Sequence, residues 1–164
     1  MSGLFEFPNP VNDKAARTVA TGVVFMGLLF AVTGWGWVLI PLAYGFWARV
    51  LTGPTLSPLG QLATKVIAPR LGAAVEVPGP PKRFAQGIGV AFTTTASITY
   101  LAGSSGAARI IIACLVVAAS LEAFIGLCLG CKAFAVLMRL GVIPESVCID
   151  CGDLTKRHPE LAQR

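Results

Sequence analysis

The sequence predicts an all-α integral membrane protein. We expect a bundle of four transmembrane helices, an interfacial amphipathic helix, and a short cytoplasmic C-terminal helix and tail. Hydrophobic residues make up 55% of the 164-residue chain and charged residues only 13%, and the mean hydropathy is +0.74. A soluble domain is far less apolar. At this length one membrane domain is expected to cover residues 1–164.

Four apolar runs define the predicted membrane-spanning helices. They cover about residues 15–32, 35–51, 84–102 and 107–127. A helix needs roughly 20 apolar residues to cross a bilayer, so the shorter runs only just qualify. In the third run, Gly87, Ala91 and Thr95 repeat at the spacing that favours close packing of membrane helices.

The residues between the second and third runs predict a separate helix over about residues 58–68. Ser57 and Pro58 are typical of a helix N-cap and first helical position, and Pro69 is expected to end the helix. Its apolar residues fall on one face, but it is too short to span a bilayer. Two placements stay open: the helix lies in the membrane interface, or it packs on the bundle.

The distribution of Lys and Arg predicts the topology. The net charge of +5 could suggest a nucleic-acid partner, but the basic residues gather in particular loops and not on a periodic face. They flank the start of the first run, fill the loop after the second and follow the fourth, whereas Arg109 alone lies at the other side. The positive-inside rule therefore places both termini of this multi-pass plasma-membrane protein in the cytoplasm. The expected partner is the lipid bilayer, and no nucleic acid is expected.

The candidate functional residues are two Cys-x-x-Cys pairs in the segment 128–153. Cys128 and Cys131 lie where the fourth apolar run ends, and Cys148 and Cys151 follow in a short polar tail after an interval of sixteen residues. Thiols at a cytoplasmic face are normally kept reduced, so permanent disulfides are not expected. The fifth cysteine, Cys114, lies in the middle of an apolar run and is expected to be a packing residue.

The cysteine pattern leaves three interpretations open. The spacing is typical of a four-thiolate zinc site, which would clamp the C-terminal tail to the end of the fourth helix. Each pair can also close a disulfide, and neighbouring pairs can pass one along by thiolate exchange. Otherwise the thiols are inert. Gly141 and Pro144 should end a helix over residues 132–140 and let the chain reverse, so we expect the two pairs to converge.

The surroundings of the first pair favour thiolate chemistry. Gly130 is expected to break the helix between Cys128 and Cys131, so that Cys131 begins the next helix. The positive end of that helix, together with Lys132, would stabilise its thiolate.

Glu122 is the only acid inside an apolar run and is therefore a functional candidate. It lies six residues before Cys128, about 9 Å away if the helix is continuous. Two roles stay open: a hydrogen bond to the hydroxyls of the third run, or proton relay. In both roles its side chain is expected to face the bundle, because an unpaired carboxylate in hydrocarbon is too costly.

Four segments of the sequence carry a resemblance to a known family. They read PNPVNDKAARTV, GPTLSPLGQLATKVIAPRLG, GPPKRFAQGIG and CLGCKAFAVLMRLGVIPESVC. Over nearly its whole length the chain resembles the bacterial membrane family called domain of unknown function 4395. The resemblance implies a small bacterial membrane protein, of a kind common in actinobacteria, with paired thiols at Cys128, Cys131, Cys148 and Cys151.

The resemblance also implies an association of that family with thioredoxin-like and sulfurtransferase proteins. We therefore expect thiol–disulfide or sulfur-transfer chemistry with such a partner, carried by the four paired cysteines and Glu122. The alternative is a non-enzymatic subunit of a larger membrane complex, in which zinc bound by the same four cysteines has a structural role.

Overall fold

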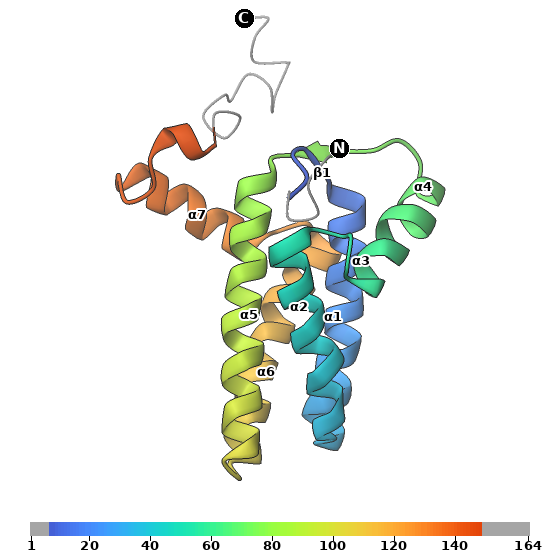
Figure 1. Ribbon diagram of the computed structural model, residues 1–164, viewed down its shortest axis with the longest axis vertical. Coiled ribbons are helices and arrows are strands. Elements are labelled where there is room, and N and C mark those ends of the chain that lie inside the picture. Colours follow the sequence, from blue (N-terminus) through green and yellow to red (C-terminus); the bar gives the residue numbers. More distant parts are fainter. Residues whose placement is uncertain (1–6, 149–164) are drawn as a thin grey trace, which may run out of the picture.

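The computed structural model describes residues 7–148, and this part of the chain is almost entirely helical (Figure 1). Its elements in chain order are β1 (Val11–Asn12), α1 (Asp13–Thr33), η1 (Gly36–Val38), α2 (Leu39–Thr52), α3 (Pro58–Leu62), η2 (Ala63–Ile67), α4 (Ala68–Arg70), β2 (Glu76–Val77), α5 (Gly79–Leu101), α6 (Ser105–Ser120), η3 (Leu121–Ile125), α7 (Leu129–Arg139) and η4 (Glu145–Val147). The segments η2 and η3 are π-helical, and η1 and η4 are 3₁₀-helical.

The four longest helices, α1, α2, α5 and α6, form a bundle. Helix α1 packs on α6, α6 on α5, and α5 on α2. Figure 1 shows that α3, α4, α7 and the β1–β2 pair gather at one end of this bundle. The opposite end carries short turns at Gly34 and Gly103, where φ is +71° and +86°. The cysteine-bearing segment therefore lies at the end with the longer connections.

Within residues 7–148, two helices are long and apolar enough to cross a membrane. These are α1 and the continuous helix formed by α6 and η3, each 21 residues long, with mean hydropathies of 1.8 and 2.2. The second and third predicted runs also form helices, but α2 lacks the length and α5 lacks the hydropathy of these two. Helix α2 has 14 residues because the chain before it is 3₁₀-helical. Helix α5 has 23 residues, but its Thr and Ser residues make it less apolar.

Local capping explains where the helices begin and end. The Asn12 side chain accepts the backbone N–H of Lys14 at 3.0 Å, and Ser57 accepts that of Gly60 at 3.1 Å. The predicted helix start at Ser57 is thus confirmed. Pro69 does not end this helix as predicted: it lies in α4, directly after the π-helical segment η2, and the helix continues to Arg70.

The segment from α3 to α4 packs on the bundle. Ala63 and Ala68 are buried and form a small core with Ala15 and Val19 of α1. Leu62 and its neighbours on the other side are exposed. This segment therefore packs on the bundle. Its exposed apolar side chains are compatible with contact with the membrane interface, which stays a prediction.

The predicted packing stripe on α5 is wrong. Ala91 and Thr95 are exposed, and the close approach is instead at Gly89. The ring of Phe46 on α2 lies against Gly89, where any Cβ would overlap it. The Phe46 side chain on α2 packs over Gly89 and buries it. The spacing of small residues within α5 alone does not predict that contact.

Candidate thiol site

The helix that leads to the cysteines ends at Gly126, which has φ of +76°. This left-handed conformation suits glycine and ends the helix at Ile125, about two residues before the predicted end at residue 127. The predicted break at Gly130 is wrong, because Gly130 lies in the first turn of α7 and packs against Ala85 of α5. Phe134 continues the same contact, with its ring centre 5.6 Å from that of Phe84.

Cys128 is the N-cap of α7. Its backbone is extended, and its Sγ accepts the backbone N–H of Cys131 at 3.2 Å. The sulfurs of Cys128 and Cys131 lie at disulfide-bonding distance, with 5.2 Å between the Cα atoms. Cys128 is 9% exposed and Cys131 is half-buried. The pair thus occupies the positive end of an 11-residue helix, a position that stabilises a thiolate.

A cavity of about 230 Å³ opens beside this pair. We call it the surface cavity. Its lining includes Cys128, Cys131, Lys82, Lys132 and Asp13. Two ammonium groups and one carboxylate therefore share a cavity with the thiols. Cationic neighbours lower the pKa of a cysteine and favour its reactive, deprotonated form.

Lys82 is the centre of a buried ion cluster. Its Nζ lies 3.0 Å from Oδ1 of Asp13 and 2.7 Å from Oε1 of Glu122. The Lys82 side chain is only 9% exposed. This ion cluster joins α1, the start of α5 and η3 at the end of the bundle that carries the thiols.

The ion cluster keeps Lys82 protonated. Burial by itself lowers the pKa of Lys82, but Glu122 and Asp13 outweigh burial and raise it above the ordinary value. Lys82 precedes the apolar part of α5, in the first turn of that helix. The ammonium is therefore a permanent charge at physiological pH.

Glu122 faces the bundle, as predicted, but its partner differs from the predicted one. The hydroxyls of Thr93, Ser97 and Thr99 donate to carbonyls of α5 itself, at 2.8, 2.8 and 3.0 Å. Glu122 pairs with Lys82 instead. Sequence reasoning missed Lys82 because it follows a proline-rich linker and resembles an ordinary charged helix entrance. The signal that could have found Lys82 is that a buried carboxylate needs a nearby cation, which a neighbouring helix can supply.

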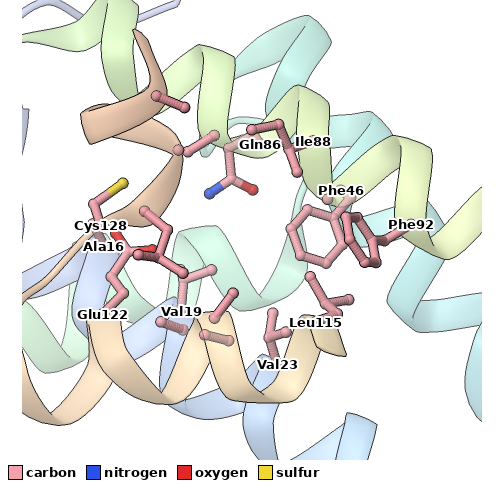
Figure 2. Close-up of a pocket in the computed structure, with 18 of the residues that line it drawn as sticks. Ala16, Val19, Val23, Phe46, Gln86, Ile88, Phe92, Leu115, Glu122 and Cys128 are labelled. Carbon is pink, nitrogen blue, oxygen red and sulfur yellow. The ribbon is translucent and has the colours of Figure 1, made fainter. Parts of the chain in front are cut away.

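A second cavity, of about 350 Å³, lies within the bundle (Figure 2). We call it the bundle cavity. Phe46 and Phe92 line one end, and Gln86, Glu122 and Cys128 line the other. The residues between them are mostly small or aliphatic; they include Ala16, Val19, Ala20, Val23, Leu115, Ala118 and Ala119. Cys128 lines both cavities, and Cys131 lines the surface cavity. No periodic pattern in the sequence marks such a space.

The outcomes for the remaining predicted residues differ. Cys148 is buried just after η4, and Cys151 is outside the described residues, so the convergence of the two pairs stays a prediction. Within residues 7–148, no group of three or more His, Cys, Asp or Glu side chains could hold a metal ion. Cys114 is a free, exposed thiol on α6 that also lines the bundle cavity, and it is not the packed residue expected. Gly141, at φ of +72°, follows the end of α7 as predicted.

Comparison with known proteins identifies one matching family. The model of a family described as Domain of unknown function (DUF4395) matches residues 11–139. The match covers most of the chain, including the ion cluster and the first cysteine pair, and it confirms the resemblance seen in the sequence. No curated protein and no solved structure matches.

Proposed function

This chain belongs to the DUF4395 family, and we propose that it is a membrane protein that exchanges disulfides or transfers sulfur with a thioredoxin-like partner. One observation carries the proposal. Cys128 caps a helix in a Cys-x-x-Cys pair whose sulfurs border a cavity with two lysines. This arrangement supports thiolate formation, which disulfide exchange requires.

The positions of the two sulfurs suggest the order of the exchange. A partner thiolate attacks Sγ of Cys131, which is the less buried of the pair. The Cys128–Cys131 bond breaks, a bond between the partner and Cys131 forms, and Cys128 leaves as a thiolate. The N–H of Cys131 and the positive end of α7 stabilise that leaving group. A second thiol of the partner then attacks the mixed disulfide, which releases Cys131 and oxidises the partner.

Single-cysteine variants test this order. In a background that keeps only the first pair, Cys128→Ser leaves Cys131, and Cys131→Ser leaves Cys128. Each would react with a thioredoxin whose single remaining cysteine carries thionitrobenzoate, and release of this group is followed by absorbance. We expect Cys128→Ser to form the mixed disulfide about tenfold faster or more, because Cys131 is more accessible.

Two results would contradict the proposal. One is that neither variant forms a mixed disulfide. The other is a protein purified with one zinc ion per chain whose four paired thiols keep their oxidation state during redox titration. The second result would favour the structural zinc site instead.

The same proposal places the chain in the bacterial plasma membrane with four spans and both termini in the cytoplasm. All four long helices expose large apolar side chains, which include Phe25, Val32, Ile40, Leu51, Ile98, Leu101, Ile110 and Phe124. Such surfaces favour contact with lipid over contact with water. The basic loops gather at the thiol-bearing end of the bundle, which supports a cytoplasmic position for that end.

Cysteine labelling tests this topology. Ser104→Cys and Pro80→Cys would be introduced separately into a chain without its native cysteines. A membrane-impermeant maleimide should label residue 104 from outside intact cells and residue 80 only from the cytoplasmic side, for example in inverted vesicles. Labelling of residue 104 from the cytoplasm together with residue 80 from outside would overturn the topology.

A further inference from the structure

We infer that the bundle cavity binds a lipophilic quinone, which takes the two electrons released when Cys128 and Cys131 form a disulfide. This inference rests on the proposed thiol exchange and names the second substrate of the same site. It starts from the position of Cys128, whose side chain lines the surface cavity on one side and the bundle cavity on the other.

The shape and lining of the bundle cavity suit an apolar ring with a hydrocarbon tail. Its volume of about 350 Å³ lies within the usual range for small-molecule sites. Phe46 and Phe92 close one end, and Val19, Val23 and Leu115 form one wall (Figure 2). Figure 2 also shows that the sulfur of Cys128 lies at the end opposite the two rings.

The polar end of the bundle cavity calls for a hydrogen-bond acceptor on the ligand. Oε1 of Gln86 accepts a hydrogen bond from Nε of Arg49 at 2.8 Å, which fixes the amide. The amide nitrogen of Gln86 points into the cavity in Figure 2, and within residues 7–148 it donates to no protein acceptor. A purely apolar ligand would leave that donor without an acceptor, whereas a quinone carbonyl would satisfy it.

The chemistry of the neighbouring thiols selects a quinone among carbonyl compounds. Oxidation of the Cys128 and Cys131 thiols forms one S–S bond and releases two electrons and two protons. A quinone takes up both, its two carbonyl oxygens become hydroxyls, and it leaves as the hydroquinone. Bacterial membranes use quinones in this way to drain electrons from protein dithiols. Glu122 lines the cavity beside Cys128 and is placed to pass one of the protons.

The test uses the full chain, purified in detergent with its first cysteine pair reduced. The probe is a decyl benzoquinone with a fully substituted ring, because thiols cannot add to such a ring. Quinol formation is followed by absorbance, and the remaining thiols are counted. We expect one disulfide for each quinol formed.

Two variants locate the reaction in the bundle cavity. Ala118, half-buried on α6, lines the cavity, and Ala118→Phe should fill it and slow quinone reduction about tenfold or more. The matched control is Ala113→Phe, at an exposed position of the same helix. Gln86→Glu keeps the acceptor for Arg49 but removes the donor, so it should raise the quinone concentration needed for half-maximal rate. In all three, exchange with thioredoxin should continue.

The outcomes separate this inference from the proposed function. If the wild type exchanges with thioredoxin but does not reduce the quinone, the inference is wrong and the proposed function stands. If Ala118→Phe and Gln86→Glu reduce the quinone as fast as the wild type, the bundle cavity is not the site. If Ala118→Phe does not fold, Gln86→Glu decides. Loss of both reactions in the wild type would overturn the proposed function itself.

Discussion

Lys82→Met is expected to lower the free energy of unfolding by about 3–5 kcal/mol, the usual cost of removing one partner from a buried ion pair. The substitution keeps the length of the side chain but removes the ammonium that contacts Asp13 and Glu122. Those carboxylates are only 22% and 16% exposed, so water cannot fully replace the lost partner. Urea unfolding in detergent, followed by circular dichroism, would measure the loss.

The neighbouring residue provides a matched control. Arg83 is exposed, and its Nε donates to the carbonyl of Val50 at 3.0 Å. Arg83→Met should therefore change the free energy of unfolding by less than about 1 kcal/mol. Equal losses in Lys82→Met and Arg83→Met would show that the ion cluster contributes no special stability.

The pKa of Lys82 adds a dependence on pH. Because Glu122 and Asp13 raise this pKa in the folded protein, the ammonium contributes fully below the ordinary lysine pKa. Its contribution is lost as the pH rises through the raised pKa of the folded state. The wild type should therefore lose stability in strongly alkaline solution, and Lys82→Met should lack this component of the loss.

Features that depend on neighbouring residues in the chain could be predicted from the sequence. Ser57 begins its helix because its hydroxyl accepts a nearby N–H, and Gly141 ends α7 because it adopts positive φ. Glu122 could be placed toward the bundle because a carboxylate in hydrocarbon is costly. Each of these inferences requires only local geometry or the polarity of one side chain.

Features that depend on distant parts of the chain could not be predicted. Gly126 and Gly130 are equally able to end a helix, and contact with Ala85 of α5 keeps Gly130 inside α7. In the same way, Lys82 and Glu122 are separated by 40 residues and meet only because α5 packs against α6. The bundle cavity has no sequence signal, since it is the space that several helices leave between them.

The cysteine pattern illustrates the same limit within the candidate site. Its spacing fits a four-thiolate zinc site, and each Cys-x-x-Cys pair by itself also fits disulfide exchange, so the spacing alone does not separate the two. The structure adds what surrounds the first pair: a helix start, a buried lysine and a cavity on each side of Cys128. Those surroundings favour exchange, and Lys82 is the residue through which stability and exchange can be separated.

Replacing the whole ion cluster is expected to restore stability without restoring the exchange rate. The triple variant carries Asp13→Asn, Lys82→Met and Glu122→Gln, so the buried charges are removed together. Most of the free energy of unfolding that Lys82→Met loses, about 2–4 kcal/mol, should therefore be recovered. Asn and Gln keep the size of the acids they replace and can still hydrogen-bond. Urea unfolding under the same conditions as for the single variant measures the recovery.

Disulfide exchange in this triple variant should remain about three- to tenfold slower than in the wild type at neutral pH. Lys82 lines the surface cavity with both cysteines, and without its ammonium the departing Cys128 thiolate has one cation fewer beside it, which makes Cys128 a poorer leaving group. The rate of reduction of the Cys128–Cys131 disulfide by thioredoxin measures this effect, and Lys132→Met, which removes the exposed lysine of the same cavity, is the comparison. If the triple variant recovers both stability and rate, Lys82 acts only through the structure. If it stays slow while unfolding like the wild type, the charges of the ion cluster serve the thiols directly.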